Sequence, residues 1–515
     1  MHYLRCLFHP SLISSLLVLY SCGAGPDTIP ERTDFSMIKN VVVLVGDDHA
    51  AYASGAYGNA LIRTPRLDGL AGQGVFFTRA YANAPLCSAS RQSLLTGRYP
   101  HAAGVTLLRT SFPEAQVTLA EHLSDQGYRT GVFGKTHFNN AGSHGFDTLV
   151  GRRHWHAHLD ENPPRPVPEG QAYYGEWRPF RDPARVWLNA EALPLPYFDE
   201  DMEDTFYADA ASEFIREADP RPFLCWIGFH NPHSPFNFPE EYRDAYAPEN
   251  MPVPEGSPED DRWIPEVFRD LNMEEKQGIA AAYYTSVEHL DSNVGRVLDA
   301  LEASGRADST LVIYLGDQGY LLGHHKRFEK HMMWEEAIRA PLIMRFGSAK
   351  LRGGEVRALC EFVDLTPTVL ELLGLPPLPS AQGKSLLPVL SGRQARHKPL
   401  VFSEFLADNK AMVRTDRWKY IYTTGKRDLG QGYATGFPPP GVTHRLYDLL
   451  NDPEEKTDLA GQPAYRDTLL SLQDRMLELF HQTHPLADSI RHLSPDAQLA
   501  AYCEPPDNNA DLQAR

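Results

Sequence analysis

The chain has 515 residues, 42% of them hydrophobic, and a formal net charge of −18. This length predicts one large domain together with a smaller one. The negative charge argues against nucleic acid or an anionic membrane surface as a partner, and it makes any local cluster of Arg and His informative.

The first residues are predicted to be a targeting segment. His2 and Arg5 precede an apolar run at 12–20, which is too short for a membrane-spanning helix. Residues 1–22 resemble a bacterial lipoprotein signal, with cleavage before Cys22 and a lipid attached to it; a plain secretory signal is the alternative. Both predict export, so we expect a periplasmic protein, an outer-membrane-anchored lipoprotein or a secreted protein. Residues 23–36 are predicted to be a polar tether.

Apolar runs and amphipathic segments alternate along the next 350 residues. Strands are expected at 41–45, 75–77, 128–133, 223–229, 311–315 and 341–345, and helices at 64–74, 114–126, 202–218 and 278–303. This alternation predicts an α/β domain with a large, mostly parallel sheet flanked by helices. The segment 152–200 has no clear period and is predicted to be a long loop, either functional or disordered.

The pattern changes near Gly392. Short alternating segments at 400–402, 411–414 and 419–422 predict a small antiparallel sheet, and a helix is expected at 465–483. We therefore predict a catalytic domain at 37–392 and a smaller C-terminal α+β subdomain at 393–515.

Polar clusters follow four of the predicted strands at the point where each strand ends. They are Asp47-Asp48, Lys135 with His137, His230 with His233, and Asp317-Gln318. The carboxyl ends of parallel strands lie at one edge of a sheet, so these side chains are expected to converge. Three carboxylates and an amide oxygen suit a hard cation, Ca²⁺ or Mg²⁺, and not Zn²⁺. An Asp pair that only caps a helix is the alternative for Asp47-Asp48 taken alone.

A cysteine, Cys87, stands at a predicted helix start four residues before Arg91. A cation and a helix N-terminus lower a thiol pKa, which predicts a reactive group; a small buried residue is the alternative. Arg91, Lys135, His137, His233 and Lys330 would together form an anion pocket, suited to a sulfuryl or phosphoryl group.

The motifs that carry these residues resemble those of the type I, formylglycine-dependent sulfatases of the alkaline-phosphatase-like superfamily, including bacterial polysaccharide sulfatases. Cys87-Ser88-Ala89-Ser90-Arg91 resembles the signature Cys-x-Pro-Ser-Arg, with Ala89 in place of Pro. Gly134-Lys135-Thr136-His137, the histidine loop at 228–235, Gly316-Asp317-Gln318-Gly319 and Lys330 resemble other family segments in the family's order. The resemblance covers most of the chain.

The resemblance implies a sulfuric ester hydrolase in which Cys87 is converted to formylglycine (3-oxoalanine) and acts, as the hydrate, as the nucleophile. It implies a calcium site made by Asp47, Asp48, Asp317, Gln318 and the modified Cys87. Arg91 would hold the hydrate, and Lys135, His233 and Lys330 would bind sulfate oxygens. Either His233 or Lys330 would protonate the leaving alcohol, and His137 would take the proton of the second hydroxyl. A formylglycine-generating maturation enzyme is an implied partner.

The substrate is expected to be a sulfated polysaccharide or oligosaccharide. Arg152, Arg153, His154 and His156 lie in the 152–200 segment of an acidic protein. We predict that they contact a sulfated, uronate-containing saccharide, with an ordinary exposed loop as the equal alternative. A phosphonate monoester or phosphodiester hydrolase of the same superfamily is the alternative enzyme. An inactive carbohydrate-binding surface protein is the alternative from a different class.

Overall fold

The computed structural model describes residues 35–180, 192–262, 264–349, 354–424 and 441–505. The predicted targeting segment, with Cys22, and nearly all of the predicted tether lie outside these residues. Within the described ranges, no helix combines the length and the apolar character that crossing a membrane requires. Residues 33–515 form one compact unit that contains both main sheets.

The larger sheet has eight strands in the order β5-β4-β6-β1-β7-β8-β2-β9. The first five of these run parallel, whereas β8 is antiparallel to both β7 and β2. The predicted mostly parallel sheet is therefore confirmed, with one strand reversed. Its strands are β1 (Asn40–Gly46), β2 (Val75–Phe77), β4 (Arg129–Gly134), β5 (Thr148–Val150), β6 (Phe223–Gly228), β7 (Thr310–Gly316), β8 (Leu342–Phe346) and β9 (Gly354–Val356).

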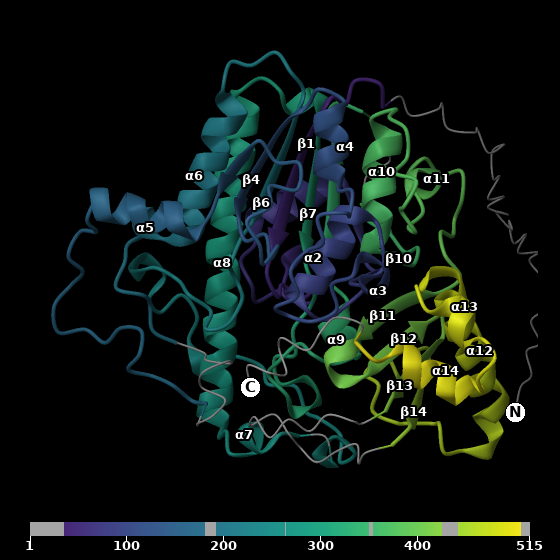
Figure 1. Ribbon diagram of the computed structural model, residues 1–515. Coiled ribbons are helices and arrows are strands. Elements are labelled where there is room, and N and C mark those ends of the chain that lie inside the picture. Colours follow the sequence, from purple (N-terminus) through teal and green to yellow (C-terminus); the bar gives the residue numbers. More distant parts are fainter. Residues whose placement is uncertain (1–34, 181–191, 263, 350–353, 425–440, 506–515) are drawn as a thin grey trace, which may run out of the picture. The chain divides into compact units, whose positions relative to one another are not determined.

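Both faces of this sheet are covered by helices, as the unbroken β-branched run of β1 predicts. Val41 and Val43 point into one hydrophobic core and Val42 and Leu44 into another, because successive strand residues face opposite sides. Figure 1 shows α6 and α8 on one side of the sheet and α4 and α10 on the other. These helices and two others are α1 (Pro65–Gln73), α2 (Cys87–Thr96), α4 (Leu119–Asp125), α6 (Glu203–Arg216), α8 (Met273–Ala303) and α10 (Leu365–Leu372).

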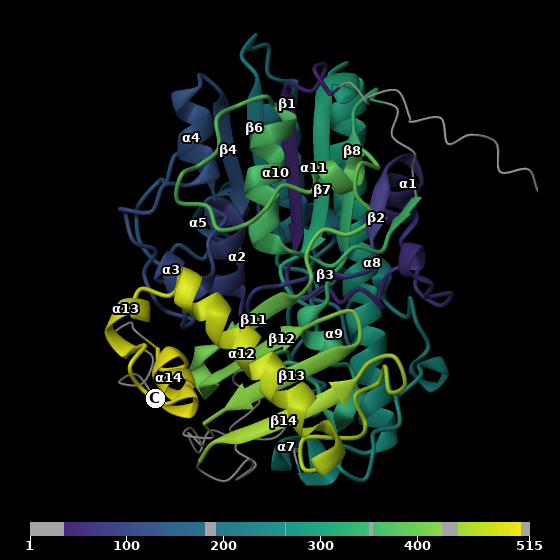
Figure 2. The ribbon, with the colours of Figure 1, turned by 90° about the vertical axis from the view of Figure 1, so that its right-hand side faces the viewer.

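The C-terminal part forms the predicted antiparallel sheet, with one strand more than expected. Its order is β11 (Val401–Phe405), β12 (Lys410–Arg414), β13 (Trp418–Thr423) and β14 (Thr443–Asp448). Figure 2 shows α12 (Arg466–Thr483) crossing this sheet. Met476 and Phe480 of α12 share a core with Phe402 and Tyr420, which fixes the helix on the sheet.

The helix expected at 278–303 begins earlier, at Met273, and two other predicted segments also differ from the structure. The helix expected at 114–126 begins only at Leu119, because Thr118 and Glu121 form a reciprocal capping box. The segment 152–200 was expected to be a loop, but its first ten residues form α5 (Arg152–Glu161). Trp155 is the one buried side chain of α5. The sequence of this helix therefore has no repeating apolar positions from which a helix could be predicted. The remaining short strands and α-helices of the described residues are β3 (Ala80–Tyr81), β10 (Cys360–Glu361), α3 (Pro100–Ala103), α7 (Glu266–Arg269), α9 (Glu335–Ile338), α11 (Leu387–Leu390), α13 (Ala487–Ile490) and α14 (Pro495–Tyr502).

Candidate active site

Four strands of the large sheet end at the same level. Gly46 of β1 pairs with Gly316 of β7, and Gly134 of β4 pairs with Gly228 of β6. The polar residues that follow these glycines therefore meet at one edge of the sheet, as the sequence predicted.

Three buried carboxylates form the centre of the site. Asp47, Asp48 and Asp317 each place a carboxylate oxygen within 4.8 Å of the others. The backbone N–H of Asp48 donates to Asp317 Oδ1 at 3.0 Å. Tyr283 of α8 donates to the Asp48 carbonyl at 2.6 Å, and thereby helps to hold Asp48 at a left-handed φ of 66°. Like charges this close repel one another unless cations lie nearby.

The protein itself supplies cations to this cluster. Lys135 forms an ion pair with Asp47, and the Lys330 ammonium lies 2.6 Å from Asp48 Oδ1. Arg91 Nε donates to Asp317 Oδ2 at 2.7 Å. His233 is also at the cluster, with its Nε2 3.8 Å from Asp48 Oδ2.

The buried carboxylates differ in acidity. Burial alone would raise the pKa of Asp47, but Lys135, His233 and Arg91 together hold this pKa well below its usual range. Burial and the neighbouring Asp47 raise the pKa of Asp317 to about 7. The positive charges of the protein side chains alone therefore do not keep Asp317 fully ionised near neutral pH.

The donor set fits a hard divalent cation. Asp47 Oδ1 and Gln318 Oε1 are buried oxygens without a hydrogen-bond partner among the described residues. Gln318 Nε2 donates to Asp48 Oδ1 at 2.5 Å, so the amide lies against the carboxylate cluster. Oxygen-only ligands of this kind suit Ca²⁺ or Mg²⁺ better than Zn²⁺.

Cys87 is the first residue of α2 and is buried beside the carboxylates. Its Sγ, a carboxylate oxygen of Asp47 and a ring nitrogen of His233 all lie within 4.8 Å of one another, and Lys330 Nζ is 3.9 Å away. The sequence predicted a lowered thiol pKa here. The structure shows the opposite: burial raises the pKa of Cys87 more than Lys135 and Lys330 lower it. The unmodified thiol is therefore not an activated nucleophile.

Helix α2 also positions the loop that follows β4. Arg91 Nη1 donates to the Lys135 carbonyl at 2.9 Å. Gln92 Nε2 donates to the carbonyls of Thr136 and His137, at 3.1 and 3.0 Å. His137 adopts a left-handed φ of 57°, which is uncommon for a residue with a side chain. We infer that Gln92 stabilises this loop conformation.

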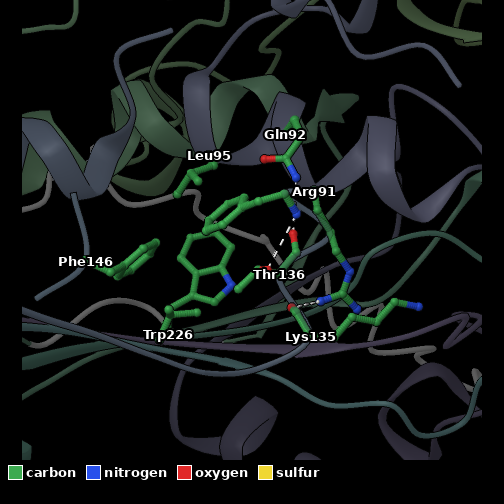
Figure 3. Close-up of a pocket in the computed structure, with 9 residues that line it drawn as sticks. Arg91, Gln92, Leu95, Lys135, Thr136, Phe146 and Trp226 are labelled. Atoms are coloured by element: carbon green, nitrogen blue, oxygen red, sulfur yellow. Dashed lines mark hydrogen bonds between the residues drawn. The ribbon is translucent and has the colours of Figure 1, made fainter. Parts of the chain in front are cut away.

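An apolar pocket lies behind the same loop. Figure 3 shows Trp226, Phe146 and Leu95 on one side of Thr136, with Arg91 and Lys135 on the other. The loop thus packs on hydrophobic side chains, while its Lys135 reaches the carboxylate of Asp47.

The imidazole of His137 is held neutral at this site. Burial and the nearby Lys135 lower the pKa of His137 well below its usual range. Its Nδ1 is buried and has no hydrogen-bond partner among the described residues. A neutral ring nitrogen without a donor is available to accept a proton.

The predicted saccharide-binding residues are not part of this cluster. Arg152, Arg153, His154 and His156 lie on α5 and are exposed. Arg152 forms an ion pair with Glu203, and His154 Nδ1 accepts the Gly151 N–H at 3.1 Å. His230, whose role the sequence left open, lies 3.5 Å from Glu203.

Some residues that shape the site were not predicted from the sequence. Gln92 follows Arg91 directly, and Tyr283 belongs to the buried helix α8. Asp204 of α6 accepts the N–H groups of His230 and Asn231, each at 2.8 Å. Asn231 in turn accepts the Asp47 N–H at 3.0 Å. No local pattern marks these residues, because their partners are distant in the sequence.

The large, mostly parallel sheet and the C-terminal antiparallel sheet belong to the alkaline-phosphatase-like fold class. The sulfatase family model matches residues 39–375, and a second model, N-sulphoglucosamine sulphohydrolase, C-terminal, matches residues 323–482. The chain therefore belongs to the sulfatase family, as the motifs predicted, and is a sulfuric ester hydrolase.

Relatives in sequence agree with this assignment, and a solved structure shares the fold. An arylsulfatase from Clostridium perfringens is 26% identical, over 84% of this chain and 92% of its own. An N-acetylglucosamine-6-O-sulfatase from Bacteroides thetaiotaomicron is 25% identical, over 86% of each chain. The structure of a phosphonate monoester hydrolase of Agrobacterium radiobacter shares the fold, with a TM-score of 0.71 at 23% identity, over 86% of this chain and 96% of that one.

Proposed function

We propose that this sulfatase hydrolyses sulfate esters of a saccharide, with Cys87 converted to formylglycine beside a bound Ca²⁺. The observation that carries the proposal is the position of Cys87. Its Sγ lies among Asp47, His233 and Lys330, yet burial raises its pKa as a thiol. A residue placed at the centre of the anion pocket, but unreactive as it stands, is suited to be the precursor of the nucleophile.

Asp47, Asp48, Asp317 and Gln318 would hold the calcium ion. Their oxygens are buried, close together and in part without partners among the described residues. When bound, a divalent cation supplies a Lewis acid that lowers the pKa of a coordinated hydroxyl and orients the sulfate. Its charge would also offset the burial and the repulsion from Asp47 that raise the pKa of Asp317.

The remaining residues act on the substrate and on protons. Lys135, His233 and Lys330 surround the cluster and would donate to sulfate oxygens. Either His233 or Lys330 would protonate the leaving alcohol. His137, held neutral by burial, would accept a proton from the nucleophile. Arg91 is fixed by Asp317 and by the Lys135 carbonyl, so it would hold the nucleophile in place.

Conversion of Cys87 requires an oxidising maturation enzyme. Cys87 is buried in the folded chain, so we expect that enzyme to act before α2 packs. Ala89, which replaces the more frequent Pro of the motif, lies in the first turn of α2 and is buried. Backbone N–H groups of the first turn have no intrahelical partner, so Ala and Pro are both compatible with this position.

A saccharide substrate is supported by relatives such as the N-acetylglucosamine-6-O-sulfatase. An exported protein, with or without a lipid on Cys22, would meet such a polymer outside the cytoplasm. The predicted signal and anchor remain part of this proposal.

Mass spectrometry of the peptide that contains Cys87 tests the proposed nucleophile. Protein purified from the native host should carry an aldehyde in place of the thiol, and the Cys87→Ala variant should be inactive. An active native enzyme with an unmodified thiol would contradict the proposal. Rates on an aryl sulfate, a phosphodiester and sulfated saccharides test the substrate class, since preference for the phosphodiester would favour the alternative enzyme.

A further inference from the structure

Helix α5 begins at the edge of the sheet that carries the active site. β5 pairs with β4, with Val150 opposite Phe133, and α5 follows one residue later. A Cβ atom on Gly151 would lie 3.9 Å from the Gly134 carbonyl, and Gly134 directly precedes Lys135. Figure 1 shows α5 projecting outward beside α6. The first turn of α5 therefore lies on the rim of the site.

Glu203, the first residue of α6, holds Arg152 at this rim. Arg152 Nε donates to Glu203 Oε1 at 2.9 Å, and Nη2 donates to Oε2 at 2.8 Å. Tyr207 donates to Glu203 Oε1 at 2.5 Å, and His230 Nε2 lies 3.5 Å from the same oxygen. His230 belongs to the loop that also carries His233. The carboxylate is thus fixed between the guanidinium and the active-site loop.

The guanidinium of Arg152 has a second edge that is not used by Glu203. The ion pair with Glu203 uses only Nε and Nη2 of the guanidinium, and Nη1 makes no hydrogen bond within the described ranges. The side chain of Arg152 is 58% exposed, whereas that of Glu203 is 14% exposed. An arginine has five N–H donors in a planar fork, so the Nη1 and Nη2 edge can bind another anion in bidentate fashion.

We propose that Arg152, oriented by Glu203, binds a second anionic group of the substrate, next to the sulfate ester that is cleaved. This inference rests on the proposed function. The group would be a carboxylate or a further sulfate ester on the same saccharide, because a guanidinium edge matches both. In a protein of net charge −18, the remaining N–H donors of Arg152 favour an anionic group at this point of the rim, although the guanidinium charge is paired with Glu203. Glu203 acts through Arg152 and is a positioning residue.

The proposal selects Arg152 from the four residues of α5 that the sequence predicted to bind the saccharide. His154 caps its own helix through the Gly151 N–H, and His156 lies against Trp155, with ring centroids 4.8 Å apart. Arg152 alone among the described residues of α5 forms an ion pair with Glu203, and Glu203 in turn lies next to His230 of the active-site loop.

The test compares Arg152→Ala with wild type on three kinds of sulfate ester. The first is 4-nitrophenyl sulfate, which has no second anion. The second is a uronate-containing sulfated disaccharide together with its carboxyl-reduced form. The third is a pair of disaccharides with one or two sulfate groups. Arg66→Ala is the matched control, because Arg66 is exposed and bidentately paired with Asp299 and has no place in the proposed site.

Arg152→Ala should raise KM for the substrates with a second anion by about tenfold, the effect of one charge-assisted contact. It should leave kcat on 4-nitrophenyl sulfate near the wild-type value and reduce the preference for carboxylated or doubly sulfated substrates. Arg152→Lys should recover only part of this preference, because an ammonium cannot bond Glu203 and a second anion with one planar fork. Glu203→Gln should have a smaller effect in the same direction. Arg66→Ala should behave as wild type.

Unchanged preferences in Arg152→Ala would overturn the proposal, and an equal loss on all substrates would show that Arg152 supports the fold instead. Failure of the proposed function has a different signature, because wild-type enzyme with formylglycine would then hydrolyse none of these esters. In that case, calorimetric binding of the same disaccharides to wild type and Arg152→Ala still decides the role of Arg152: equal affinities refute it.

Discussion

Replacement of Gln92 by Leu tests whether a buried amide holds the catalytic loop in its active form. Gln92 is fully buried, and its Nε2 donates to the carbonyls of Thr136 and His137, at 3.1 and 3.0 Å. Leucine has a similar volume and removes both hydrogen bonds. Each contributes about 1 kcal/mol, so the observed loop conformation would lose about 2 kcal/mol relative to alternatives.

The consequence for catalysis follows from the backbone of His137. Its left-handed φ of 57° costs on the order of 1 kcal/mol by itself. A loss of about 2 kcal/mol corresponds to a change of about 30-fold in the ratio of the active to the alternative loop conformations. We therefore expect kcat of Gln92→Leu to fall, by up to about 30-fold, with a smaller effect on the free energy of unfolding.

The assay measures kcat on 4-nitrophenyl sulfate, divided by the formylglycine content of each preparation, because Gln92 lies near the modified residue. Gln473→Leu is the matched control. Gln473 is buried in α12 and donates to Asp496 at 2.7 Å, outside the active site. This variant should lose stability but keep kcat. The reasoning is refuted if Gln92→Leu retains wild-type kcat, or if Gln473→Leu loses kcat to the same extent.

Two further predictions concern the metal site and the effect of pH. Removal of divalent cations by a chelator should abolish activity and lower the melting temperature. Ca²⁺ should restore both better than Zn²⁺, because the site consists of carboxylates that lie close together, those of Asp47, Asp48 and Asp317. Asp317→Asn should weaken this recovery, and full activity in the presence of the chelator would contradict a role for the metal. His484 is predicted to make folding pH-dependent, since burial lowers its pKa to about 3. The unfolded chain then binds a proton below about pH 6.5 that the folded chain excludes, so the free energy of unfolding falls by about 2 kcal/mol between pH 6.5 and pH 5. Urea unfolding at pH 7.5 and pH 5 should show a smaller pH effect in His484→Gln, and an identical effect in both proteins would rule this contribution out.

The sequence by itself determined the class of fold and the edge of the large sheet at which the active site forms. β1 was predicted because its β-branched residues form a continuous apolar run, and Asp47-Asp48 follows it directly. The same holds for the strands before Lys135, His230 and Asp317. These signals are local: a buried strand needs apolar side chains on both faces, and parallel strands place their carboxyl ends together.

Only the tertiary structure decided which of the predicted groups contact one another and with what effect. Cys87 was expected to have a lowered pKa as a residue at a helix start, but its burial outweighs the nearby lysines. Burial depends on how α2 packs in the tertiary structure, so the ten residues of α2 could not reveal it.

The same distinction separates Arg152 from its neighbours on α5. The sequence indicated a cluster of Arg and His, whereas the structure pairs Arg152, alone among the Arg and His residues of α5, with the carboxylate of Glu203, 51 residues later. Likewise, Gln92 bonds carbonyls 44 and 45 residues away. Hydrophobic periodicity and helix caps depend on neighbouring residues, so they can be recognised in the sequence. The contacts of Arg152 and Gln92 form only when the fold brings distant segments together. The sequence therefore determined which chemical groups are present at the site, and folding determined how they are arranged.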